Sequence, residues 1–222
     1  MDWQALSLSL KLAVATMLIL LPISLLFAHV LAFVRFRFKT LAEALVMLPL
    51  VLPPTVLGFY LLLAMGETSW LGHAFAKLFG ASLSFSFTGV LIASLVFNLP
   101  FMVQPIQRAF EAIAEDIREA ALVSGLSRWQ RLLKVELPLA WPGIVSALVL
   151  TFAHTLGEFG VVLMVGGSIP AETKTLSIAI YDRVQAFDTK GAAVMSLILL
   201  LVSSIAIMAS FAATRRFGHS RR

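Results

Sequence analysis

The sequence predicts an all-α membrane protein with about five transmembrane helices. Hydrophobic residues make up 59% of the 222 residues and charged residues only 13%, so a soluble domain of this length could not bury the apolar surface. The apolar residues also gather into stretches long enough to cross a hydrocarbon core, which takes about 20 residues of helix. Membrane lipid is therefore the expected covering of this surface.

Five stretches have this character, and each is interpreted as one span. They cover about residues 8–34, 41–65, 88–104, 143–165 and 191–213. The first is not expected to be a cleaved signal peptide, because Asp2 stands in place of a basic leader and the apolar run is too long. Residues 66–87 are too interrupted for another span, and we expect an interfacial loop or a short re-entrant helix there.

The basic residues are distributed unevenly between the two sides of these spans. Of the 17 Lys and Arg residues, 12 fall after the first and third stretches or in the C-terminal tail, and five fall on the other side. The positive-inside rule then places the N-terminus outside and the C-terminus in the cytoplasm. This topology also explains the net charge of +5, so no nucleic-acid partner is predicted.

A charged segment, at about residues 109–140, separates the third and fourth spans. Ile117, Ala120, Ala121 and Ser124 follow helical spacing and would form a narrow face of small groups open to another protein. Gly125 is expected to end this helix as a C-terminal cap. Two short helices at a defined angle are the expected result.

The second of these helices has its own start signal. Ser127 and Gln130 form a capping-box pattern, and Trp129, Leu132 and Leu133 would supply the apolar side.

This segment contains Glu-Ala-Ala, a Gly six residues after the Glu, and a later Leu-Pro. In these features it resembles the cytoplasmic docking loop of bacterial ABC importer permeases. Val135 stands where Ile is more usual in that motif. The resemblance implies a type I ABC importer permease-like bundle, with residues 1–222 as one transmembrane permease domain and the loop seated in a cleft of an ATPase subunit. The implied ATPase-coupling residues are Glu119, Ala120, Ala121, Gly125, Leu126, Ser127 and Arg128. The alternative is an ordinary amphipathic connection on the bilayer surface.

Prolines interrupt the second span. Pro53 and Pro54, followed by Thr55, lack N–H groups and must kink or break the helix, and the carbonyls they free are tolerated only against protein or water. This segment is therefore expected to face the bundle interior as part of a pathway or gate, and Asn98 in the third span has the same character. Bending alone, or an ordinary interhelical hydrogen bond from Asn98, are the alternatives.

The fourth span carries the only carboxylate expected deep in the membrane, Glu158, which follows Gly157. His154 lies one turn earlier and could pair with it. A carboxylate repels an anionic cargo, so Glu158 is expected to be a structural or gating partner. His29 has no obvious partner. A metalloprotease reading fails because no second His follows at helical spacing, and no catalytic or metal-binding residues are predicted.

Three further runs, at residues 48–58, 156–160 and 169–181, resemble the molybdate importer permease family, with sulfate and thiosulfate permeases as near relatives. The resemblance implies a homodimer in the bacterial inner membrane, two cytoplasmic ATP-binding subunits and a periplasmic oxyanion-binding protein. The sequence has no phosphate-binding loop of the Walker type, so we expect ATP and Mg²⁺ to bind to the partner ATPase and no cofactor to bind to this chain. The resemblance implies molybdate or tungstate as the cargo, with sulfate or thiosulfate as the alternative.

Two other classes of membrane protein are alternatives to a permease of this kind, a secondary transporter and an intramembrane enzyme. A secondary transporter usually shows paired broken helices in two related halves, and an intramembrane enzyme needs a convergent nucleophile and base.

Overall fold

The computed structural model describes residues 1–219, and the elements within them are helical. In chain order they are α1 (Trp3–Phe33), α2 (Lys39–Val51), α3 (Pro54–Met65), α4 (Trp70–Phe79), α5 (Phe87–Glu111), α6 (Glu115–Val123), α7 (Arg128–Arg131), the π-helical turn η1 (Leu132–Glu136), α8 (Leu137–Gly157), α9 (Gly160–Gly166), α10 (Leu176–Gln185) and α11 (Thr189–His219). Arg221 and Arg222, which contribute to the predicted charge asymmetry, lie outside the described residues.

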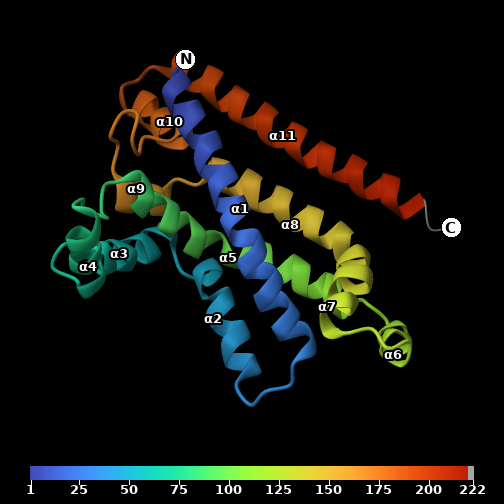
Figure 1. Cartoon of the computed structure of the whole chain (residues 1–222). Coiled ribbons are helices and arrows are strands. Elements are labelled where there is room, and N and C mark those ends of the chain that lie inside the picture. Colours follow the sequence, from blue (N-terminus) through green and yellow to red (C-terminus); the bar gives the residue numbers. More distant parts are fainter. Residues whose placement is uncertain (220–222) are drawn as a thin grey trace.

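Helix α5 is the centre of the bundle, and α1, α2, α8 and α9 pack around it (Figure 1). The main core joins Met102, Val103 and Ile106 of α5 to α1 and α8. Ala28 of α1 and Ala140 of α8 are both fully buried, and their small side chains let α1 and α8 approach closely. The bundle is thus held by close packing of small and branched side chains.

The prediction of an all-α membrane fold is confirmed. Among the described residues, four helices are long and apolar enough to cross a membrane, and the pair α2 and α3 counts as a fifth crossing if it is one broken span. The residues at 66–87 contain α4, a ten-residue helix with Ser69 as its N-cap and Gly80 as its C-cap. Of the two forms expected for this segment, an interfacial loop or a short re-entrant helix, the structure shows a short helix, and its place relative to the membrane stays a prediction.

The second span is broken rather than continuous. The chain bends by 108° between helices α2 and α3. Leu52 is extended at ψ 138°, as expected for a residue before proline, and Pro53 is extended at ψ 134°. Pro49 lies inside α2 without ending it, so the two consecutive prolines cause the break.

The predicted bounds of the fourth span are wrong at both ends. One helical run extends from Arg128 through η1 to Gly157, and α9 is a separate short helix. The second of the two predicted short helices is therefore the start of the fourth span. Hydropathy placed its start at residue 143 because the first turns are polar, although helical geometry continues through them.

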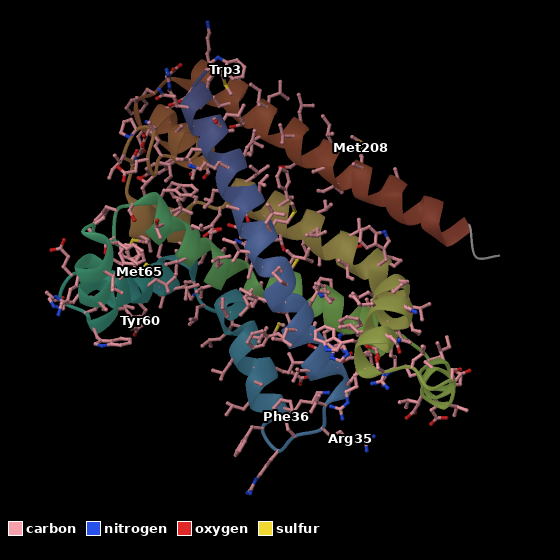
Figure 2. The ribbon with its side chains drawn as sticks, viewed as in Figure 1. Trp3, Arg35, Phe36, Tyr60, Met65 and Met208 are labelled. Atoms are coloured by element: carbon pink, nitrogen blue, oxygen red, sulfur yellow. The ribbon has the colours of Figure 1, made fainter. Side chains whose placement is uncertain are left out.

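The two ends of α1 identify the two ends of the bundle. Figure 2 shows Trp3 at one end and Arg35 and Phe36 at the other. The Arg35 end also holds α6 and α7, because the Arg118 guanidinium of α6 lies 3.6 Å from the centre of the Phe33 ring. The charged loops after the first and third spans thus share one end of the bundle.

Candidate functional site

The predicted caps between α6 and α7 are confirmed. Gly125 has φ +74°, and the Leu126 N–H donates to the Ala121 carbonyl to close the end of α6. The Ser127 N–H donates to Gln130 Oε1 at 2.9 Å, while the Gln130 N–H donates to Ser127 Oγ at 3.3 Å. Gly125 is one of the places where this chain requires a glycine, because a left-handed conformation strains other residues.

The predicted coupling residues fall into an exposed group and a more buried group. Those open to solvent are Glu119, Ala120, Gly125, Ser127 and Arg128. Ala121 is buried and Leu126 is half-buried, so the expected face of small residues is not free along its whole length.

Four large apolar side chains of the α6–α7 segment are exposed, and Ile117, at 41%, is the least exposed of them. Leu122 is 55% exposed, Val123 89% and Trp129 73%. Trp129, which the sequence assigns to the apolar side of its helix, is thus exposed on the single chain. Large apolar side chains gathered on one short exposed segment make a candidate interaction patch. Sequence reasoning missed this patch, since hydropathy alone assigns such residues to the interior.

A second candidate site is a buried polar cluster between α5 and the end of α8. The Asn98 Nδ2 donates to Glu158 Oε2 at 3.2 Å, and Ser94 Oγ donates to the same oxygen at 3.3 Å. His154 Nδ1 lies 2.9 Å from Asn98 Oδ1, and Thr16 Oγ1 of α1 donates to Ser94 Oγ at 3.2 Å. The cluster ties α1, α5 and α8 together.

The expected direct pairing of His154 with Glu158 is replaced by a link through Asn98. Helix α8 ends at Gly157, and Glu158 is its C-cap residue, with φ −66° and ψ 130°, so the chain leaves the helix after Glu158. The prediction that Glu158 bonds to a neighbouring helix agrees with its contacts to α5. Its other oxygen, Oε1, is buried without a hydrogen-bond partner in the described part of the chain.

A cavity of about 450 Å³ lies beside this cluster. It is lined by Pro54, Phe97, Ala153, His154, Gly157, Glu158, Phe159 and Gly160. The structure thus brings together three of the predicted pathway residues, Pro54, Gly157 and Glu158, while Asn98 lies behind them, fully buried. Gly160 allows this approach, because a Cβ there would lie 2.8 Å from Pro54 Cβ.

Pro53 and Thr55 do not line the cavity. Both are exposed on the single chain, as is Pro54. On the single chain, Pro53 and Thr55 therefore do not face the interior of its own helices, and their pathway role stays a prediction. The α2–α3 break projects its side chains outward, since α3 packs sideways on α9 through Gly58.

Glu158 is one of two buried carboxylates among the described residues. Glu136 is fully buried, and His29, which had no obvious partner, places its Nε2 2.8 Å from Glu136 Oε2. The sequence held no signal for this pair, because the two residues are 107 positions apart.

Apolar spanning helices, an exposed capped hairpin at one end, and a cavity beside a broken helix with His154 and Glu158 in its mainly apolar lining are features of a membrane permease. The sequence matches the family described as "Binding-protein-dependent transport system inner membrane component" over residues 10–218. The chain belongs to this family of multi-pass inner-membrane permeases.

Curated relatives share most of the chain. It is 44% identical to the molybdenum transport system permease protein ModB of Azotobacter vinelandii, over 97% of this chain and 95% of that protein. It is 37% identical to ModB of Escherichia coli K12, over 94% of this chain and 92% of that protein. The sulfate transport system permease protein CysT of the same organism is 33% identical, over 87% of this chain and 70% of that protein.

Solved structures share the fold. A bacterial ABC transporter that imports the acidic polysaccharide alginate superposes with a TM-score of 0.78 at 18% identity, covering 96% of this chain and 78% of that one. The MetNI methionine ABC transporter, in an inward-facing conformation, gives 0.72 at 18% identity, covering 97% of this chain and 94% of that one. The bundle is therefore that of ABC importer permeases.

Proposed function

We propose that this chain is the transmembrane permease subunit of an ATP-driven importer for molybdate. Two copies form the translocation pathway, and two cytoplasmic subunits bind ATP and Mg²⁺ and carry out hydrolysis. A periplasmic binding protein delivers the oxyanion. The N-terminus lies outside and the C-terminus in the cytoplasm.

The exposed α6–Gly125–α7 segment carries the ATP-driven part of the proposal. Its apolar patch, defined by Leu122, Val123 and Trp129, offers a docking surface, and α7 runs without a break into the fourth span. A push on this segment therefore moves a membrane-spanning helix directly. The choice of cargo rests on the 44% identity to a molybdenum permease over 97% of the chain.

In this proposal, the polar cluster holds the pathway in one conformation. The donors Asn98 and Ser94 hold the Glu158 carboxylate, and with it the segment between α8 and α9, against α5. The carboxylate is unsuited to hold an oxyanion, because like charges repel. We assign it to gating, with alternating access produced when ATP binding favours one arrangement of the two copies.

Transport by the reconstituted complex tests the proposal. Proteoliposomes should contain this chain, its ATPase subunit and its binding protein, and labelled molybdate uptake should be measured with unlabelled competitors. We expect ATP-dependent uptake that tungstate inhibits and an equal concentration of sulfate does not. Equal uptake without the ATPase subunit would instead indicate a secondary transporter.

Sulfate or thiosulfate is the second candidate cargo, favoured by the 33% identity to a sulfate permease over 87% of the chain. Sulfate uptake that exceeds molybdate uptake in the same proteoliposomes would establish it. The ATP-driven permease mechanism would then stand with a different cargo.

A further inference from the structure

A buried ionic cluster joins helix α6 to the membrane helices. Its centre is Glu136, which is fully buried at the end of η1. His29 Nε2 of α1 lies 2.8 Å from Glu136 Oε2, and Arg131 Nε of α7 donates to Oε1 at 3.1 Å. Arg118 Nε of α6 lies 3.5 Å from Oε1, which is an ion-pair distance without hydrogen-bond geometry. Four elements therefore meet on one carboxylate.

The π-helical turn makes this arrangement possible. Arg131 and Glu136 are five residues apart, a spacing that an α-helix places on different faces and a π-turn brings into register. The Leu137 N–H donates to the Leu132 carbonyl, five residues earlier, as a π-turn requires. The turn thus aims Glu136 at both Arg131 and α1.

Arg118 is the main polar attachment of α6 to the bundle. In that helix only Arg118 and Ala121 are withdrawn from solvent. The Arg118 guanidinium lies 3.6 Å from the Phe33 ring centre of α1, and the Phe33 ring packs against His29 and Phe110. Arg118 therefore contacts both the carboxylate and the end of α1.

We propose that Glu136 is a positioning residue that fixes α6 to α1 and to the start of the fourth span, so that these elements move as one body. This inference rests on the proposed function, in which α6 receives the motion of the ATPase. A buried carboxylate that loses its cations is strongly disfavoured, so the cluster resists separation while α6 is displaced. Force applied to α6 then reaches α1 as well as α8.

The test measures the distance between two labelled residues and the number of oxyanions transported per ATP. The chain has no Cys, so Glu115→Cys on α6 and Val34→Cys at the end of α1 give two unique spin-label sites. Because the complex holds two copies of this chain, the distance within one copy must be separated from those between copies by diluting labelled with unlabelled chain. In the reconstituted complex, we expect a narrow distance between the two labels of one copy that is the same with and without ATP. Glu136→Gln should broaden that distance and lower the number of oxyanions transported per ATP several-fold, while ATP hydrolysis continues.

Arg118→Gln provides the second variant, because its half-buried side chain can be changed with less risk to folding. It should produce the same two effects, and the double variant should be no worse than the more severe single one, since both act through one contact. The matched control is Arg108→Gln, which removes an exposed ion pair with Glu111 at the same end of the bundle. It should leave the distance and the transport ratio unchanged.

Unchanged label distances and transport ratios in both Glu136→Gln and Arg118→Gln would overturn the inference. So would additive effects in the double variant. Failure of the proposed function is a separate result, because it would appear as absence of ATP-dependent uptake in the wild-type complex, whereas the label distance is measured independently of transport.

Discussion

Replacing Gly125 by valine tests whether the turn between α6 and α7 couples ATP hydrolysis to transport. Gly125 has φ +74°, and a Cβ added there meets no atom within 4 Å. The penalty is therefore backbone strain alone, about 1–2 kcal/mol for an L-residue in this conformation. A change of that size lowers the population of the native turn relative to its alternatives by a factor of about 5–30.

Gly80 offers a matched control for this change. It has φ +67°, and a Cβ added there also meets no atom within 4 Å. It ends α4, away from the docking segment, so Gly80→Val introduces the same kind of strain at a site with no proposed role in coupling. Comparing the two variants separates a general loss of stability from a specific loss of coupling.

The assay is oxyanion uptake and ATP turnover in the same proteoliposomes, with recovery of the assembled complex measured first. Gly125→Val should insert normally and transport at least about fivefold fewer oxyanions per ATP, or bind the ATPase subunit correspondingly less well. Gly80→Val should keep the wild-type ratio. If Gly125→Val also assembles fully and keeps that ratio, the angle between α6 and α7 is not the coupling element.

Four other outcomes are expected. Glu119→Lys should weaken recovery of the ATPase subunit without affecting insertion, as measured by co-purification; normal recovery would remove Glu119 from the contact. A reporter inserted near Glu172 should behave as periplasmic and one fused at the C-terminus as cytoplasmic, and the reverse pattern would overturn the topology. Replacing both Pro53 and Pro54 by Ala should favour a continuous helix and slow uptake; unchanged uptake at normal abundance would make the break a tolerated bend. Asn98→Leu should lower the free energy of unfolding by about 1–3 kcal/mol, seen as a lower thermal midpoint in detergent, because the buried carboxylate beside it loses a donor.

The sequence predicted the features that depend on local chemistry. The five apolar stretches correspond to four long helices and one broken pair. The Gly125 turn and the Ser127 capping box are where the pattern placed them, because the glycine conformation and the cap need only neighbouring residues. The exposure of Trp129 was not predictable in this way, since it depends on what α7 packs against.

Contacts between residues far apart in the sequence were the ones missed. Glu136 follows the basic start of the fourth span and carries no local sign that it is buried. Its burial is tolerated because His29, Arg118 and Arg131 converge on it from elsewhere in the fold. Ser94 was missed for the same reason, because its role in the cluster appears only when α5 meets the end of α8.

The break between α2 and α3 leaves α2 too short to cross a membrane alone. Helix α2 has 13 residues and so rises only about 20 Å, whereas a hydrocarbon core is about 30 Å thick. If α2 begins at the membrane surface, the break at Leu52 and Pro53 falls inside the hydrocarbon core, where the last carbonyls of α2 have no helical donors ahead of them. Hydrocarbon cannot satisfy those carbonyls. The exposed face around Pro53 and Thr55 must accordingly lie against water or another protein, and lipid can cover only the rest of the chain.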